Sequence, residues 1–255
     1  MKHAALLAIL SIFASHALCA ADASSSFSDG NNAYVAAASL PGDEAAASYA
    51  KAVECYEQAL KDGGPSWTAE FNLGNSYYKL GDYGKALLHY ERALATDPLK
   101  PETRANMEQL RKTAGLSGMR EEGRIESWAL RVPMNGWMWA GALFGWAFLA
   151  AVVLPPLYGR HRLATISASV AAFALFSICI LGMYGWHIHA KWQIVTAPDT
   201  LLKSAPAEEA STIRQIPPAS YAKVMKTHGD WEFVRTENGD EGWLSGGKAE
   251  EVWER

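Results

Sequence analysis

Three features are scarce in this sequence, and each scarcity excludes a class of protein. Only three cysteines occur, Cys19, Cys55 and Cys179, too few for a disulfide scaffold or a zinc ribbon. Basic residues do not exceed acidic ones: 23 lysines and arginines accompany 27 aspartates and glutamates, which argues against nucleic acid as a partner. Charge is absent altogether from Val132–Gly159 and Leu163–Ala190, which contain no Lys, Arg, Asp or Glu. Two such windows indicate a membrane protein.

The charges that are present divide the chain into three parts. Asp22–Gly118 carries a formal charge of −4 and Ile188–Arg255 one of −3, whereas Met119–His187 between them carries +2. Apolar residues make up 49% of the chain, which excludes a disordered protein. We therefore expect a multidomain protein in which two mildly acidic pieces flank a very apolar middle.

The N-terminus has the pattern of an export signal. Lys2 and His3 precede an apolar stretch of about a dozen residues, which small residues follow. We expect a secretory signal peptide over residues 1–21, with cleavage between Cys19 and Ala23. An uncleaved anchor and a lipoprotein are the alternatives, although Leu18 fits a lipoprotein poorly.

A repeat with a period of 34 residues follows the signal. Tyr49, Ala52, Tyr56 and Ala59 recur as Tyr83, Ala86, Tyr90 and Ala93. The alanines let two helices approach closely, and the tyrosines fill the space beside them. Gly81-Asp82 is expected to end one helix and cap the next, and Pro98 to stop the second. Phe71–Pro98 therefore resembles a tetratricopeptide repeat, which implies an all-α solenoid of stacked helix pairs.

The rest of the solenoid is less regular. Glu44–Lys61 fits the second helix of an earlier repeat, but the first helix, around Phe27–Ala38, lacks the Leu-Gly pair found at Leu73-Gly74. Glu102–Thr113 is expected to be a capping helix, so residues 22–118 would hold two repeats and a cap.

Helix pairs of this kind present a concave surface for a partner peptide or helix. Asn72, Asn75 and Lys79 lie at helical spacing on one polar face, and they are our candidates to line that groove. A merely solvated face is the alternative. The tyrosines of the repeat are expected to pack in the core.

The apolar middle predicts a two-helix transmembrane hairpin over residues 137–186, after a linker over residues 119–136. Trp137–Tyr158 and Leu163–Trp186 are each long enough to cross roughly 30 Å of hydrocarbon, and aromatic residues lie near their ends. The turn between them, residues 159–162, holds two arginines, which marks it as cytoplasmic. With the export signal, this turn predicts that both flanking domains lie outside the cytoplasm.

Strand patterns begin at Trp192. Apolar residues alternate in Tyr221–Thr227, and Trp231–Arg235 and Glu241–Leu244 flank a turn with Asn238-Gly239, which favours a tight hairpin. The run Gly229–Arg235 with Gly239–Leu244 resembles a bacterial SH3 domain, which implies a small all-β SH3-like barrel over residues 187–255.

The SH3 resemblance also implies recognition of peptidoglycan peptides or of protein partners. Tyr221, Trp231 and Trp243 are the candidates for the ligand face of such a domain. Packing of the tryptophans in the core of the barrel is the alternative.

The order of these parts, together with Asn72–Gly81, Gly84-Lys85-Ala86 and Tyr90–Leu94, resembles the BatE family of aerotolerance-operon proteins. The resemblance implies a bacterial inner-membrane protein with both soluble domains in the periplasm. It also implies that the protein acts together with von Willebrand A-type membrane proteins and a MoxR-class ATPase.

No catalytic motif stands out: the sequence has no recognisable nucleophile–base set, phosphate loop or metal cluster. We expect a non-catalytic scaffold, without cofactor or metal, that contacts the lipid bilayer and binds protein partners. The alternative is an envelope anchor or sensor that binds peptidoglycan peptides through the SH3-like domain.

Overall fold

The computed structural model describes residues 23–116, 120–157 and 163–252. The signal peptide expected over residues 1–21 and the turn expected over residues 159–162 lie outside these ranges. The chain divides into two compact units. The first combines the N-terminal helices with the strands from Gln193 onward, and the second contains the helices between Arg120 and Trp192.

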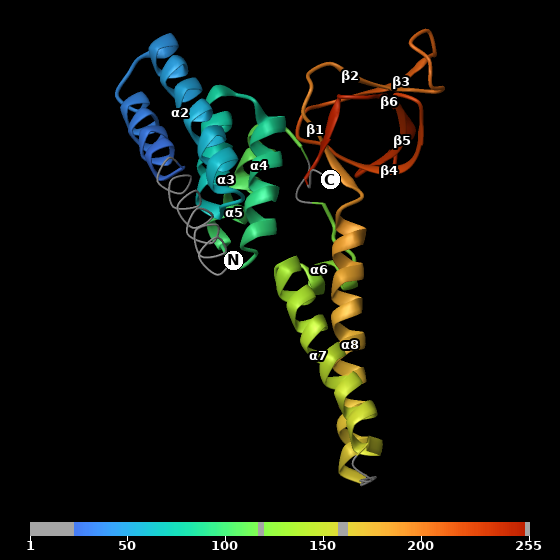
Figure 1. Cartoon of the computed structure of the whole chain (residues 1–255). Helices are drawn as coiled ribbons and strands as arrows, with labels where there is room; N and C mark the ends of the chain where they lie inside the picture. The colour runs from blue at the N-terminus through green and yellow to red at the C-terminus, as the bar shows by residue number, and fades with distance from the viewer. Residues whose placement is uncertain (1–22, 117–119, 158–162, 253–255) are drawn as a thin grey trace, which may run out of the picture. The chain divides into compact units, whose positions relative to one another are not determined.

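The first unit opens with consecutive helices that pack side by side (Figure 1). A helix over the described residues 23–37 comes first. It is followed by α2 (Gly42–Gly63), α3 (Trp67–Leu80), α4 (Tyr83–Thr96) and α5 (Pro101–Thr113). The four alanines of the 34-residue repeat are buried where these helices meet: Ala52, Ala59, Ala86 and Ala93. The expected helical solenoid is thus present as a run of tetratricopeptide-like helices.

Two glycines shape the pair formed by α3 and α4. A Cβ atom on Gly74 would lie 2.7 Å from the ring of Tyr90, so only glycine lets the helices come this close. Gly81 has a φ of 80°, a left-handed conformation that ends α3 and that glycine adopts without strain.

A second spacing, of 44 residues, relates the helix over residues 23–37 to α3. A Cβ atom on Gly30 would meet the ring of Tyr56 at 2.7 Å, as one on Gly74 would meet Tyr90. Phe27 lies 5.6 Å from Tyr56 between ring centres, and Phe71 lies 5.8 Å from Tyr90. The first helix therefore lacks the leucine of the Leu-Gly pair but keeps its glycine. This spacing of 44 residues exceeds the 34-residue period by ten, because α2 is longer than α4 and the turn before α2 is longer than the turn before α4.

The C-terminal strands form an antiparallel sheet. They are β1 (Trp192–Val195), β2 (Thr200–Lys203), β3 (Thr212–Ile216), β4 (Tyr221–His228), β5 (Trp231–Thr236), β6 (Glu241–Ser245) and β7 (Ala249–Glu251). Their order is β3-β2-β6-β5-β4-β1-β7. The expectation of a small barrel needs correction, because β3 and β7 end the described sheet without pairing to each other. One face packs a core that contains Val195, Leu202, Val234 and Leu244.

Within the first unit, a buried arginine joins α5 to the sheet. Arg111 is 1% exposed and donates hydrogen bonds to the Ala219 carbonyl and to the Glu237 carboxylate, each at 2.7 Å. Its guanidinium carbon lies 5.2 Å from the centre of the Tyr221 ring. A charged group this deeply buried needs such partners, so α5 and the sheet form one packed body.

Helix α4 makes a second set of contacts with the sheet. The Tyr221 hydroxyl donates to the Glu91 carboxylate, and Arg92 donates to the carbonyls of Glu251 and Val252 at 3.3 and 3.1 Å. Gly84 lies against the backbone of Thr196, where a Cβ atom would be 2.7 Å from its Cα. The first unit is therefore assembled from two segments that are far apart in the sequence.

The second unit contains α6 (Arg124–Ala129), α7 (Met134–Leu157) and α8 (Leu163–His189). Helices α7 and α8 run side by side, and each is long and apolar enough to cross a membrane, with mean hydropathies of 1.8 and 2.2 (Figure 1). Gly145 faces the Phe176 ring, and Gly182 faces the Trp137 ring. These glycines let the two helices pack closely.

The segment expected to be a linker, residues 119–136, holds α6, which packs against the end of α8. Trp137 and Trp186 are aromatic residues at the ends of the two expected spans, and their indole N–H groups donate to the carbonyls of Ala129 and Val132 at 2.9 and 3.0 Å. A Cβ atom on Gly185 would lie 2.9 Å from the Ile125 carbonyl oxygen. Close packing and these hydrogen bonds therefore fix α6.

Three charged or polar side chains stabilise the same junction. Arg120 donates two hydrogen bonds to Glu126, at 2.6 and 3.1 Å, and His189 Nδ1 lies 3.0 Å from the Glu126 carboxylate. Burial alone would raise the pKa of Glu126, but the hydrogen bonds from His189 and Arg120 and their positive charge lower it to about 2.

Candidate functional site

Two copies of one hydrogen-bond arrangement run along the helical repeat. In the first copy, Asn31 Oδ1 accepts from the Tyr56 hydroxyl at 2.8 Å and from Asn72 Nδ2 at 3.1 Å. In the second, Asn75 Oδ1 accepts from the Tyr90 hydroxyl at 2.7 Å and from Asn106 Nδ2 at 2.8 Å. We call these two sets the asparagine ladder. Each set links three helices, so it fixes the position of one helix pair against the next.

Burial of the tyrosines keeps the ladder neutral. Burial raises the pKa of Tyr56 to about 12, and it also raises the pKa of Tyr90. Both hydroxyls therefore remain protonated donors at physiological pH. The side-chain oxygens of Asn31 and Asn75 therefore each accept a hydrogen bond from a tyrosine hydroxyl. The side-chain nitrogen of Asn75, Nδ2, has no hydrogen-bond partner among the described residues.

A pocket of about 300 Å³ brings together two of the three groove candidates. Asn75 and Lys79 line it, while Asn72 belongs to the first set of the ladder. Its other lining residues are Tyr34, Tyr78, Tyr90, Asn106 and Gln109. Lys79 is exposed, and none of the described residues that line this pocket carries a carboxylate. The pocket, which we call the groove pocket, thus offers amide groups and one positive charge.

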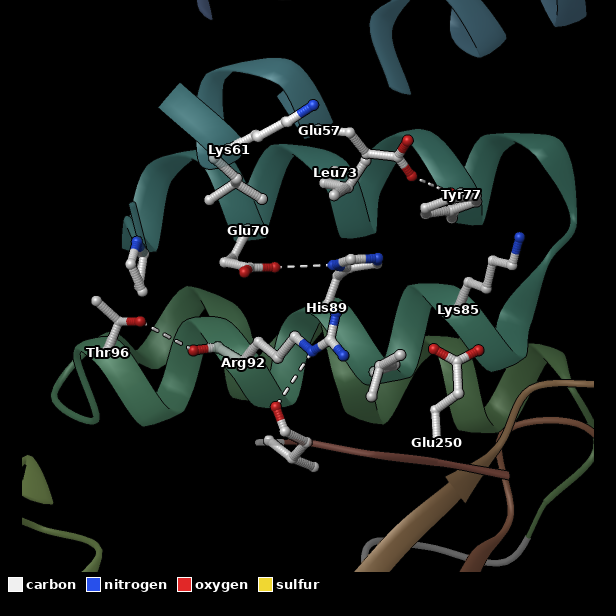
Figure 2. A pocket seen from close by; sticks show the side chains of 14 residues that line it. Glu57, Lys61, Glu70, Leu73, Tyr77, Lys85, His89, Arg92, Thr96 and Glu250 are labelled. Carbon is white, nitrogen blue, oxygen red and sulfur yellow. Dashed lines mark hydrogen bonds and ion pairs between the residues drawn. The ribbon is translucent and has the colours of Figure 1, made fainter. Parts of the chain in front are cut away.

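A larger pocket of about 690 Å³ shares no lining residue with the groove pocket. It lies among α2, α3, α4 and the end of β7, and we call it the charged pocket (Figure 2). Glu57 and Lys61 reach it from α2, Lys85 from α4 and Glu250 from β7. Leu73 and Leu88 supply apolar lining.

A buried Glu–His pair forms part of the wall of the charged pocket. Glu70 Oε2 lies 2.8 Å from His89 Nδ1, and both side chains are about nine-tenths buried. The His89 ring stacks on Tyr77, with 5.3 Å between ring centres and an angle of 8°. Tyr77 in turn donates its hydroxyl to Glu57 at 2.8 Å. These interactions hold the imidazole in a fixed orientation.

The three candidates on the sheet lie in different places. Tyr221 is buried and contacts Glu91 and Arg111, so it belongs to the contact between helices and sheet. Trp243 is half-buried and lies outside the core cluster, with its ring 5.3 Å from that of Phe233. Trp231, also half-buried, pairs with Ser245 on β6 and with His228 on β4.

A small aromatic surface surrounds Trp243. The Lys226 ammonium lies 5.3 Å from the centre of the Trp243 ring and 4.8 Å from that of Phe233, and His228 lies 6.3 Å from Trp243 between ring centres. Along β6 the neighbouring Leu244 points into the core instead. Strand alternation therefore places these aromatic rings on the opposite face of the sheet.

Sequence reasoning did not identify the charged pocket or Asn31, the acceptor in the first set of the ladder. Asn31 had a signal, because Gly30-Asn31 matches Gly74-Asn75 at the 44-residue step. The Glu70–His89 pair is separated by 19 residues and carries no motif. Among the described residues, no group of three or more His, Cys, Asp and Glu side chains is arranged to hold a metal ion.

Comparison with known families matches part of the helical repeat. The tetratricopeptide repeat family matches residues 67–98, which are α3, α4 and the turn after them. The repeat predicted from the 34-residue step is thereby confirmed. No curated protein sequence matches the chain. Because tetratricopeptide repeats are protein-interaction modules, the match indicates a role in protein–protein interaction.

Proposed function

We propose that this protein is a non-catalytic scaffold whose helical repeat binds an extended segment of a protein partner in the groove pocket. The observation that carries the proposal is the asparagine ladder. Each residue of an extended peptide presents one N–H and one C=O group. A side-chain amide can bond either group, and Asn75 keeps its amide nitrogen available beside the pocket.

The charge of the groove pocket favours a partner segment with a carboxylate. Lys79 supplies a positive charge, and no acidic residue among the described lining of the pocket neutralises it. A carboxylate placed near Lys79 would gain from this charge, whereas a basic segment would be repelled.

We further propose that α7 and α8 anchor the scaffold in a bacterial inner membrane. Their length, their hydropathy and the small share of buried residues in them, 11% in each span, support this role. The two arginines at residues 160 and 162 and the N-terminal signal pattern favour a topology with both soluble parts in the periplasm. Reporter fusions at Gly118 and Arg255 should then both give periplasmic signals, and a cytoplasmic signal from either would overturn this topology.

The resemblance to the BatE family supports a physiological process for the protein as well as its location in the inner membrane. Under this proposal the partners include von Willebrand A-type membrane proteins that work with a MoxR-class ATPase in an aerotolerance or envelope-stress complex. The support is the order of the parts along the chain and the sequence of the repeat.

Crosslinking in cells tests the scaffold function. A tagged full-length chain is crosslinked, and co-purifying proteins are identified by mass spectrometry. Lys79→Glu should strongly reduce the recovery of partners, because it reverses the positive charge that Lys79 gives the groove pocket. Lys51→Glu is the matched control: Lys51 is exposed on α2 and lines neither pocket. Equal recovery with both variants would exclude the groove pocket as the binding site.

A second candidate function is an anchor or sensor that binds peptidoglycan peptides through the sheet. The aromatic surface around Trp243 favours it, because a half-buried pair of rings with a lysine above them suits a peptide ligand. Trp243→Ala should abolish the retention of the full-length protein on isolated cell-wall sacculi, whereas Lys79→Glu should not. Retention that is unchanged by Trp243→Ala would exclude this surface.

A further inference from the structure

The charged pocket has the dimensions of a ligand site. Its volume of about 690 Å³ falls within the range of known small-molecule sites, roughly 300–1,000 Å³. It has an apolar lining, to which Leu73 and Leu88 contribute, and polar groups from α2, α3, α4 and β7 around it. Pockets with a few fixed polar groups on an apolar lining are those that orient a ligand.

Three cationic and three acidic side chains line this pocket: Lys61, Lys85 and Arg92, and Glu57, Glu70 and Glu250. Glu57 is fixed by the hydrogen bond from Tyr77, and Glu250 by a 2.8 Å hydrogen bond from the Thr196 hydroxyl. Lys61 and Lys85 line the pocket from two different helices, α2 and α4 (Figure 2). Lys85 lies 4.0 Å from Asp82 and 5.2 Å from the Tyr77 ring centre, which limits its positions.

His89 adds a fixed polar group. Its Nδ1 is engaged by Glu70, and its Nε2 has no hydrogen-bond partner among the described residues. The side chain is about nine-tenths buried and lines the pocket (Figure 2). With Nδ1–H donated to the Glu70 carboxylate, Nε2 is an acceptor for an N–H group of a ligand.

We propose that the charged pocket binds a small zwitterion, an amino acid or short peptide with both a free ammonium and a free carboxylate group. The carboxylate faces Lys61 and Lys85, and the ammonium faces Glu57, Glu250 and His89 Nε2. A ligand of one charge sign meets repulsion from half of the lining, whereas a zwitterion satisfies both halves. This site is separate from the groove pocket and requires β7 as well as the repeat.

Calorimetric titration of the detergent-solubilised full-length chain tests the proposal. Four probes differ only in their end charges: trialanine, its N-acetyl form, its amide, and the doubly capped form. Trialanine should bind most tightly, and removal of either end charge should weaken binding about tenfold or more, as expected for a lost hydrogen bond to a charged group.

Variants of the pocket test which residues contact the carboxylate of the ligand and which contact its ammonium group. Lys61→Met with Lys85→Met should weaken trialanine binding about tenfold but leave the binding of the amide unchanged. Glu250→Gln should weaken trialanine but not the N-acetyl form, because glutamine keeps an acceptor for Thr196. Lys79→Met, in the groove pocket, is the control and should bind trialanine normally.

Three results would overturn the proposal. They are equal binding of all four probes, trialanine binding that the pocket variants do not change, and no trialanine binding with a Kd below about 1 mM. Because the crosslinking experiment uses Lys79→Glu, a failure of the scaffold function leaves this test unaffected, and the reverse also holds.

Discussion

Replacing Asn75 with alanine should loosen the helix pair formed by α3 and α4. The change removes the acceptor of two hydrogen bonds, those from Tyr90 and Asn106 at 2.7 and 2.8 Å. Each bond contributes about 0.5–1.5 kcal/mol net, so the two together contribute about 1–3 kcal/mol. Asn31→Ala should cost a similar amount, because Asn31 also accepts two bonds. Asn72→Ala removes a single donor and should cost about 0.5–1.5 kcal/mol.

Hydrogen exchange followed by mass spectrometry measures this loss locally in the full-length protein. A loss of about 1–3 kcal/mol should speed exchange of the protected amides of α3 and α4 about 5- to 150-fold in Asn75→Ala. Asn75→Asp keeps the acceptor oxygen and should recover most of the protection. Exchange in Asn75→Ala no faster than in Asn72→Ala, or no recovery in Asn75→Asp, would refute the view that the acceptor holds these helices together.

Three further predictions concern contacts inside one or the other of the two units. Because the folded-state pKa of Glu126 is lowered to about 2, its contribution should be complete above the ordinary pKa of 4.5 and lost as the pH falls toward 2. A pH titration of hydrogen exchange in α6 should show this loss, and Glu126→Gln should remove the dependence. Gly185→Val should displace α6, since a Cβ atom there meets Ala129 and Ile125, at a cost of about 1–3 kcal/mol. Unchanged tryptophan fluorescence in this variant would count against the packing. Arg111→Met should lower the free energy of unfolding of the first unit by about 3 kcal/mol, because it leaves the Glu237 carboxylate without its guanidinium partner. Thermal unfolding measures this, and the addition of Glu237→Gln should restore part of the loss.

The parts of the fold that follow from local patterns were predictable. The absence of charge identified both apolar helices, because hydrocarbon admits few charged groups. The 34-residue step located α2 and α4, since the buried alanines recur wherever helices approach closely. The Asn238-Gly239 turn located β5 and β6. In each case the physical cause lies within a short stretch of sequence.

The parts that depend on distant partners were not predictable. The helix over residues 23–37 carries the same glycine and asparagine as α3, but the longer α2 shifts the step from 34 to 44 residues. Helix α6 is fixed by His189, 63 residues away from Glu126. Strand β3 is largely exposed at the end of the sheet, so it lacks the alternation that marks a half-buried strand.

The candidate sites divide in the same way. The polar face with Asn75 and Lys79 was visible in the sequence because helical spacing puts these residues together. The charged pocket was not, because three helices and the last strand contribute to it. Trp243 and Leu244 could be distinguished only once the register of β6 was known.

The assembly of the first unit from two distant segments sets an order of events during synthesis. Arg111 is made 108 residues before Ala219, its partner in the sheet. At translation rates of about 5–20 residues per second, roughly 5–20 s pass before that partner exists. During this interval the surfaces of α4 and α5 that carry Glu91 and Arg111 are open to solvent and to other chains. The helices of the repeat therefore lack their partners in the sheet until the strands that follow α8 have been synthesised.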